Sequence, residues 1–332
     1  MATIYVRKTG SDANSGLSAA LAKLTYTAAY GVAASGDTIV IGAGVYREAR
    51  LFVDKVVHFL GDYDGALTGD AGVVLIQGSA ADVTATSTSA FWLGASSSVA
   101  GSSFRWLAFS GWSNYQIYLQ GTANASNVTI TDCVFHNQNA CAAAVHTAYS
   151  SGTGPTGLVF ERCYVYGSGN GLWWYQGDNV DRTISWVVRN CVFAVSGYAL
   201  NSAHGGGCTF TNCTTMYGSG PVYVGGTGTM TVPCTMTHCL VESHGYRAQA
   251  GTLGFLTEDY NVFILGGYNV YSNVSAGANS IVRINLAEYR GWFAALSGDV
   301  ACQWDVGANW QIANNAIGAA GYSVTDWLYY DT

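Results

Sequence analysis

The segment from residue 171 to 182, GLWWYQGDNVDR, holds the side chains of this sequence that are best suited to chemistry. Three consecutive aromatic residues precede two aspartates and an arginine. Binding sites for small ligands combine apolar and aromatic surfaces with a few placed polar groups, and a sugar has both an apolar ring face and hydroxyl groups. We therefore expect this segment to contact a glycan. The candidate contacts are Trp173, Trp174, Tyr175 and Asp178.

The same segment also holds the candidate catalytic groups, Asp178, Asp181 and Arg182. Glycoside hydrolysis requires two carboxylates about 5 to 10 Å apart, one of them a general acid with a raised pKa. Polysaccharide lysis requires a base and a cation that stabilises the carbanion. A structural interpretation competes with both, because alternation along a strand places Trp174 opposite its neighbours and Gly-Asp-Asn is ordinary turn chemistry. We rank sugar contact above catalysis, and an enzymatic role stays open.

Other titratable residues are weaker candidates. The histidines His146, His204 and His244 lie at expected strand ends or glycine-rich turns, where we expect them to be solvated or bonded locally. Glu258 and Asp259 belong to a Glu-Asp-Tyr-Asn sequence that is typical of a bend between two strands.

Five segments that each carry a cysteine at the sixth position indicate how these residues are positioned. The segments are VTITDCVF (128–135), LVFERCYV (158–165), WVVRNCVF (186–193), CTFTNCTT (208–215) and CTMTHCLV (234–241). Their shared column consists of Cys133, Cys163, Cys191, Cys213 and Cys239. We expect an inward-facing ladder of reduced thiols, because free cysteine behaves as a small buried hydrophobe. The repeated CTxTxC pattern with His238 alongside suggests a zinc site as the alternative. We favour the interpretation of these cysteines as core residues over the zinc site.

Each segment is predicted to be two short strands joined by a bend. Apolar residues at positions one, three and eight alternate with polar ones, which indicates a strand with one face inward, and the polar residue at position five interrupts this alternation. Asparagine and aspartate suit such a bend because they tolerate left-handed backbone. Arg162 and His238 suit it less well.

The spacing of the five cysteines predicts a solenoid. They are 30, 28, 22 and 26 residues apart, within the range of repeat architectures, and the period-two alternation excludes a helical repeat. We predict an all-β protein, a right-handed parallel β-helix, with a short amphipathic helix within residues 17–34 that caps the first coil. One structural domain then comprises a cap and first coil (1–50), the coils (51–285) and a C-terminal capping segment and tail (286–332).

Composition restricts the partners. Charged residues make up 10% of the chain and the net charge is −7, against a usual charged fraction of roughly 25%. Nucleic acid is therefore not an expected partner, because phosphate binding requires a basic surface. The sequence has no apolar run of about 20 residues for membrane insertion and opens without a secretory leader. We expect synthesis in the cytoplasm, free thiols, no metal and no cofactor.

The N-terminal sequence YVRKTGSDANSGLS, followed by the expected helix and by SGDTIVIGAGVYRE, resembles the opening of the pectate-lyase-like right-handed β-helix superfamily. EDYNVFILGG (258–267) and INLAEYRGWFAALSGD (284–299) are similar to the last coils and closing helix of its bacterial and phage members. The resemblance implies the fold. It leaves the function open, because the superfamily includes lyases, hydrolases, epimerases, tailspikes and non-catalytic virion proteins. The acidic calcium cluster of pectate lyases is missing, as are the signatures of polygalacturonases.

We expect a non-catalytic surface protein of a bacteriophage particle, either a head decoration or a short tail spike or fibre. It would form a homotrimer, contact other virion proteins and bind a host-surface polysaccharide. One alternative is a polysaccharide lyase or glycoside hydrolase that acts through the 171–182 segment. Another is a bacterial surface adhesin. The C-terminal 30 residues, which lack the coil template, are expected to pack on the side of the solenoid or to join a neighbouring subunit.

Overall fold

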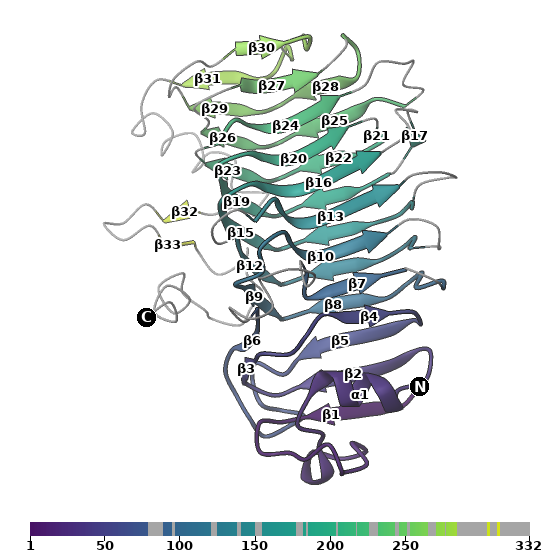
Figure 1. Cartoon of the computed structure of the whole chain (residues 1–332). Helices are drawn as coiled ribbons and strands as arrows, with labels where there is room; N and C mark the ends of the chain where they lie inside the picture. Colours follow the sequence, from purple (N-terminus) through teal and green to yellow (C-terminus); the bar gives the residue numbers. More distant parts are fainter. Residues whose placement is uncertain are drawn as a thin grey trace.

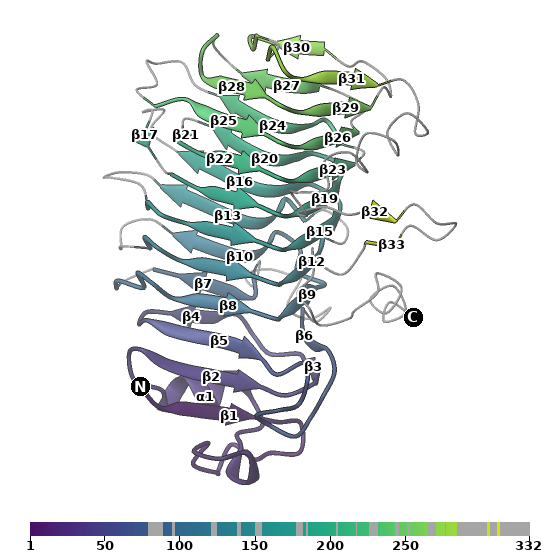
Figure 2. The same cartoon turned by 180° about the vertical axis from the view of Figure 1, so that it is seen from behind.

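The chain forms a solenoid of three long parallel sheets, which rises from the N-terminal coil to the last green strands (Figures 1 and 2). This computed structural model describes residues 1–78, 89–94, 97–120, 125–137, 141–149, 155–176, 182–183, 185–203, 205–216, 218–225, 232–242, 246–250, 253–264, 270–275, 277–283, 304–305 and 311–312. Each coil contributes one strand to each sheet in turn, so the strand order in every sheet follows the sequence. The predicted parallel β-helix is confirmed.

The three sheets are named A, B and C in the order in which a coil meets them. Sheet A has ten strands: β1 (Thr3–Val6), β2 (Asp37–Ile41), β5 (Val57–Gly61), β8 (Ser103–Arg105), β11 (Thr129–Thr131), β14 (Val159–Glu161), β18 (Val187–Arg189), β22 (Thr209–Thr211), β25 (Cys234–Thr237) and β28 (Leu256–Asp259). Sheet B also has ten: β3 (Gly44–Tyr46), β6 (Val74–Gln77), β9 (Ala108–Ser110), β12 (Val134–Asn137), β15 (Tyr164–Gly167), β19 (Val192–Val195), β23 (Thr214–Met216), β26 (Leu240–Glu242), β29 (Val262–Ile264) and β31 (Ile281–Arg283).

Sheet C is the third side of the solenoid. Its nine strands are β4 (Leu51–Val53), β7 (Phe91–Leu93), β10 (Tyr115–Gln120), β13 (Ala143–Tyr149), β16 (Asn170–Gln176), β20 (Tyr198–Ala203), β24 (Gly220–Gly225), β27 (Tyr246–Ala250) and β30 (Val270–Ser272). Two short pairs complete the described strands: β17 (Arg182–Thr183) with β21 (Gly205–Gly206), in parallel, and β32 (Trp304–Asp305) with β33 (Gln311–Ile312), antiparallel.

A single left-handed residue turns the chain from sheet A into sheet B, as the five-segment template predicts. Asp132, with a φ of 56°, separates β11 from β12. Arg162 and His238, expected to suit this bend poorly, adopt φ values of 50° and 56°. Contacts between coils favour both of them there. Arg162 donates to the Asp132 carboxylate, and the His238 ring stacks on Tyr260 with 5.3 Å between ring centroids.

The cysteines after these bends are all buried in the core of the solenoid. Their backbone carbonyls link successive coils; Cys133, for example, accepts from the Tyr164 amide one coil later at 3.0 Å. The Sγ of Cys191 lies 3.1 Å from the carbonyl of Arg189, the last residue of β18. Asn261 ends the column. Its Oδ1 accepts from the Cys239 amide at 2.8 Å, and its Nδ2 donates to the Met236 carbonyl at 2.9 Å.

The short helix predicted within residues 17–34 is confirmed as α1 (Tyr26–Val32), and a 3-10 turn, η1 (Ala19–Leu21), precedes it. Extended chain interrupts the helical structure between these two elements. The interruption lies at Lys23, whose backbone amide donates to Tyr5 and whose carbonyl accepts from Arg7. This segment therefore bonds to β1 as an extended chain instead of continuing a helix. In the described part of the chain, no helix has the length and apolar character needed to cross a membrane.

Candidate functional site

The candidate segment 171–182 is divided by the structure. Its aromatic residues lie in β16, which spans Asn170–Gln176. Asp178 and Asp181 lie outside the described residues. Arg182 begins β17, but its side chain is outside what the structure describes.

The three aromatic residues of β16 face different environments. Trp174 is fully buried in the core, so its ring cannot contact a ligand, and the prediction that it binds glycan is wrong. The alternation of a strand accounts for this, since it turns the side chains on either side of Trp174 outward. Trp173 is half-buried on the outer face, and Tyr175 is 48% exposed.

Trp173 belongs to a column of aromatic residues on the outer face of sheet C, one from each of five consecutive coils. Strand register places these residues directly above one another. In chain order the column, here called the aromatic column, consists of Phe52, Trp92, Tyr118, His146 and Trp173. The next two coils place Asn201 and Tyr223 at the same register position. A row of ring edges therefore continues into amide and hydroxyl groups.

Sequence reasoning identified Trp173 but missed the rest of the column. The signal that could have found it is the count forward from the template cysteine, because Trp173, Asn201 and Tyr223 each lie ten residues after the cysteine of their own coil. His146 lies thirteen residues after Cys133.

The rings of the aromatic column pack directly on one another. Their centroids are 5.6 Å apart for Phe52 and Trp92, 4.7 Å for Trp92 and Tyr118, 5.3 Å for Tyr118 and His146, and 4.9 Å for His146 and Trp173. A sugar inserted between two rings would require roughly 7 to 8 Å, twice the usual carbon contact distance. A ligand can therefore reach only ring edges along the column and open ring surfaces at its two ends.

Both ends of the column are accessible. At one end the Tyr175 ring packs on Trp173 with 6.1 Å between centroids and 63° between planes. At the other end Phe52 is 53% exposed. The Arg50 guanidinium lies 4.5 Å from the Trp92 ring centroid and 4.9 Å from that of Phe52, in cation–π geometry. Burial lowers the pKa of Arg50 from its usual value.

His146 is the fourth ring of the column and lies inside β13, not at a strand end. It is buried, so of the two expected environments, solvated or bonded locally, the structure excludes the first. Its ring stacks on Tyr115 with 4.2 Å between centroids and 10° between planes. Burial lowers the pKa of His146 to about 3, although a hydrogen bond with the Trp173 backbone opposes the shift. The imidazole is therefore neutral at neutral pH, and no described residue bonds its Nδ1. The ring contributes to the column as an aromatic surface instead of a charge.

The described carboxylates of the central coils lie at the bend between sheets A and B, away from the aromatic column. Asp132, with 1% of its side chain exposed, accepts from Arg105 Nε at 2.9 Å and from Arg162 Nε at 2.7 Å. Glu161 pairs with Arg162 and Arg189. Each carboxylate is held in an ion-pair network with arginine guanidinium groups.

The predicted bend at Glu258 and Asp259 is confirmed by Tyr260, which has a φ of 56°. The Glu258 carboxylate accepts from Asn261 Nδ2 at 2.8 Å and from the Gly277 amide at 2.6 Å. These bonds tie the last coils together, so the carboxylate has a structural role.

The alternative zinc site has no support in the geometry. Cys208 precedes β22 and Cys213 follows it, and the His238 ring stacks on Tyr260 at the bend. Burial raises the pKa of the Cys213 thiol, which opposes the thiolate that a metal needs. Over the residues that the structure describes, no three side chains of the metal-binding types come together.

Comparison with known proteins places the solenoid among described folds. A family model described as "Right handed beta helix region" matches residues 66–233. No curated protein matches the sequence.

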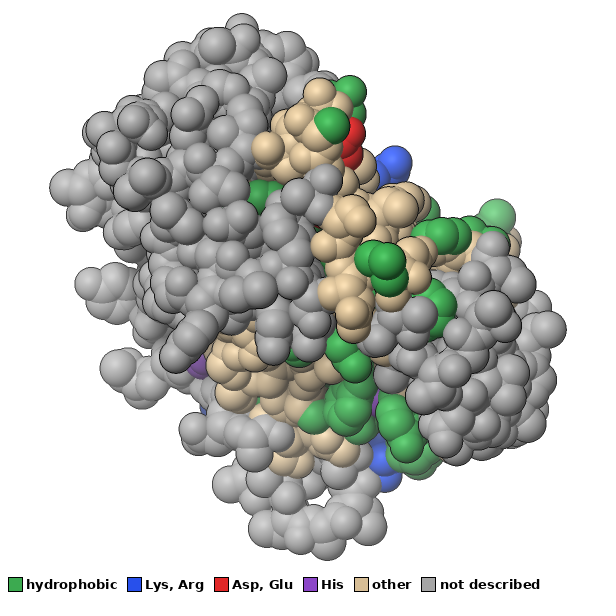
Figure 3. Space-filling view, turned by 90° about the horizontal axis from the view of Figure 1, so that it is seen from above, with side chains coloured by type: hydrophobic (Ala, Val, Ile, Leu, Met, Phe, Trp, Pro, Cys, Tyr) green, Lys and Arg blue, Asp and Glu red, His purple; other side chains and the backbone are tan. Residues whose placement is uncertain are grey.

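Seen along the solenoid axis, the described side chains are mostly apolar or uncharged, with few charged ones (Figure 3).

Several solved structures are similar in fold. XylC in complex with xylose has a TM-score of 0.51 and 10% identity, over 82% of this chain and 70% of that chain. Pectate lyase Pel9A has a TM-score of 0.47 and 14% identity, over 84% and 79%. ORF18 of Geobacillus virus E2 has a TM-score of 0.37 and 13% identity, over 77% and 57%. At 10% identity, the similarity to XylC shows the fold alone.

Proposed function

This chain belongs to the right-handed β-helix family, and we propose that within it the protein is a non-catalytic, glycan-binding surface protein of a bacteriophage particle, either a head decoration or a short tail spike. In this proposal a host-surface polysaccharide lies along sheet C. The protein forms a homotrimer and contacts other proteins of the virion.

The observation that carries the proposal is the aromatic column with its continuation. Five ring-bearing residues at one register position, followed by Asn201 and Tyr223, line the outer face of seven consecutive coils. Strands of neighbouring coils are about 4.8 Å apart, so these residues extend over roughly 29 Å. A surface of this length suits an extended polymer better than a small ligand.

The open ring of Tyr175 is the strongest single contact in this proposal. It is 48% exposed and lies where the column passes from rings to polar groups. Tyr175 lies beside Trp173 on β16, and Asn201 is the residue in register with Trp173 on the next coil, so a sugar on the Tyr175 ring would lie near this amide. Ring stacking and hydrogen bonding would then act on one glycan.

The cysteines support production inside a host cell. All eight cysteines in the described part of the chain are free thiols and are buried. Structural disulfides are common in proteins that fold in oxidising compartments, whereas reduced thiols are typical of cytoplasmic folding. A phage structural protein folds in the host cytoplasm before assembly, which agrees with this chemistry.

The carboxylate environment favours binding over catalysis. Asp132 and Glu161 are neutralised by arginines and lie outside the aromatic column. The alternative is a polysaccharide lyase or glycoside hydrolase that uses Asp178 or Asp181. A test for product formation separates these alternatives.

The decisive experiment measures mass, binding and product on one sample of the full chain. Light scattering gives the subunit number, and a panel of bacterial capsule and lipopolysaccharide glycans is tested for binding and for new reducing ends or unsaturated products. Binding without product supports the proposal. Product that disappears in Asp178→Asn or Asp181→Asn overturns it in favour of an enzyme. Absence of binding to all glycans, with no antibody labelling of phage particles, removes the virion role.

A further inference from the structure

A second outward-facing column, on sheet B, is apolar except at Thr214. Strand register stacks these residues from β3 to β26. The column, here called the apolar column, consists of Val45, Leu75, Ala108, Val134, Tyr164, Val192, Thr214 and Leu240. Its central members form a hydrophobic cluster separate from the interior core, which shows that they point away from the solenoid axis.

From Ala108 to Leu240 these outward side chains are buried, whereas Val45 and Leu75 are only partly buried. Val134 is 3% exposed and Val192 is 1% exposed. Stacking between coils does not explain such low values, because the outer face of sheet A provides a direct comparison. Val187 and Val192 lie on the same coil, in β18 and β19, and both face outward with neighbours above and below. Val187 is only partly buried. The outer face of sheet B is therefore more enclosed than that of sheet A, and a cover of additional chain would account for the difference.

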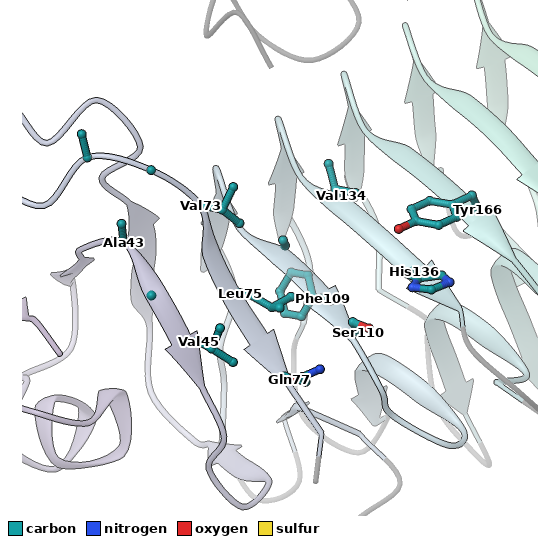
Figure 4. Close-up of a pocket in the computed structure, with 14 residues that line it drawn as sticks. Ala43, Val45, Val73, Leu75, Gln77, Phe109, Ser110, Val134, His136 and Tyr166 are labelled. Atoms are coloured by element: carbon teal, nitrogen blue, oxygen red, sulfur yellow. The ribbon is translucent and has the colours of Figure 1, made fainter. Parts of the chain in front are cut away.

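An apolar groove of about 290 Å³ lies at the N-terminal end of this column (Figure 4). Figure 4 shows Val45 on β3, Leu75 on β6 and Val134 on β12 along it, with His136 and Tyr166 at one side. Among the described residues that line it, none is Lys, Arg, Asp or Glu. The groove thus suits an uncharged, apolar segment of polypeptide.

We infer that the cover is the C-terminal segment of the same chain, residues 284–332, which folds back along sheet B. The last described strand of the solenoid, β31, belongs to sheet B and ends at Arg283, so this segment starts on the correct side. Figures 1 and 2 both draw β32 and β33 beyond the sheet B side of the solenoid, at the height of β12 and β15. The position of this hairpin agrees with a chain that returns towards the N-terminal coils.

The length and composition of the segment fit this role. The seven steps from β31 back to β9 cover about 34 Å, at about 4.8 Å per strand. An extended chain reaches roughly 3.3 Å per residue, so about ten residues make this distance and the remainder can pack across the column. The segment contains Trp292, Phe293, Trp310 and Trp327 and few charged residues. Burial of the apolar column is favourable when the segment that covers it also has apolar side chains, as residues 284–332 do.

Photocrosslinking in the full chain tests this inference. The photoreactive residue p-benzoylphenylalanine replaces Tyr164, which lies in the apolar column, and in a matched control it replaces Tyr175 on sheet C. After irradiation, we expect peptides from residues 284–332 to be joined to position 164 and not to position 175. A mixture of light and heavy isotope-labelled chains identifies which chain was joined. Crosslinks within one chain support the inference; crosslinks only between chains, or none to residues 284–332, overturn it.

Limited proteolysis gives an independent measurement. Arg290 is the only trypsin site after Arg283. Val192→Glu places a charge under the proposed cover, and we expect cleavage at Arg290 to become about tenfold faster or more, because proteolysis follows the population of the open form. Val187→Glu, on the same coil but on sheet A, should leave the rate unchanged. Equal rates in both variants would contradict the inference. A Val192→Glu chain that does not fold leaves the photocrosslinking result to decide.

Discussion

The Arg162 guanidinium binds the Asp132 carboxylate one coil below, with Nε 2.7 Å from Oδ1 and Nη2 3.0 Å from Oδ2. Both residues have left-handed backbone, and both occupy the bend between sheets A and B. The ion pair therefore joins two residues whose backbone conformation is otherwise unfavourable for non-glycine side chains. Arg105 adds a second guanidinium to the same carboxylate.

Asp132→Asn should destabilise the solenoid by about 2 to 3 kcal/mol. The variant keeps a side chain that tolerates left-handed backbone but removes the negative charge between two arginines, which are partly exposed and can recover some hydration. Urea unfolding midpoints of variant and wild type measure the change. Glu161→Gln, at a more accessible position of the same network, should cost less. A midpoint for Asp132→Asn equal to or above that of Glu161→Gln would disprove this order.

Cys191→Ser should cost about 1 to 2 kcal/mol, because a hydroxyl replaces a thiol in a fully buried apolar site. The Arg189 carbonyl, 3.1 Å from Sγ, offers the serine hydroxyl a partner and keeps the cost at this modest level. Thr235→Ser, on the outer face of sheet A, is the control and should change stability little. Coincident denaturation midpoints for Cys191→Ser and wild type would refute the buried-column interpretation.

Stability should decrease as the pH falls below about 6.5, and His146 should account for part of that decrease. The folded-state pKa of His146 is about 3 because of burial, whereas an unfolded histidine has a pKa of roughly 6.5. Between these values the unfolded chain binds a proton that the folded chain does not. Falling pH therefore favours unfolding by up to about 1.4 kcal/mol per unit.

His146→Phe provides the test, since it keeps an aromatic ring in the column and removes the titrating group. The difference in unfolding free energy between the variant and wild type should grow steadily as pH is lowered from 6.5 to 5, where few carboxylates titrate. Parallel stability curves over that range would mean that His146 titrates normally in the folded protein.

Tyr175→Ala should weaken glycan binding about tenfold, which corresponds to about 1.4 kcal/mol. The lost contact is one open aromatic face at the end of the aromatic column. Tyr260→Ala is a matched control, because Tyr260 is 51% exposed but lies at the bend between sheets A and B. Titration calorimetry with a glycan that the wild type binds measures both variants. An equal loss of glycan affinity in the two variants would show that the glycan does not bind at the aromatic column.

The fold could be predicted from the sequence because the sheet A to sheet B bend repeats with constant length. Two residues, such as Asp132 and Cys133, separate the strands on either side. Because the bend has a constant length, the segments of successive coils align in the sequence without gaps, and the alignment reveals both the strand pattern and the column of cysteines. The short helix expected within residues 17–34 is α1, and only its start at Tyr26 depends on the pairing of Lys23 with β1, a tertiary contact that local spacing does not reveal.

The candidate site could be predicted only in part. Trp173 and Tyr175 face outward as their alternation in β16 suggests, and the same alternation buries Trp174. The burial of His146 depends on Tyr115, on Tyr118 and on the register of three strands. The register residue of sheet C lies thirteen residues after the template cysteine for His146 and ten residues after it for Trp173, so spacing alone does not pair these two rings.

The constant two-residue bend also has an evolutionary consequence. Seven coils, from the Trp106 bend to the Tyr260 bend, use the same short connection between sheets A and B, while their connections out of sheet C differ in length. The constant bend between sheets A and B thus keeps the strands of successive coils in register. Insertions in the connections out of sheet C can be gained or lost in one coil without displacing the strands of neighbouring coils. A lineage of such proteins could therefore change what it recognises piecemeal, as its targets change, while inheriting an unaltered scaffold.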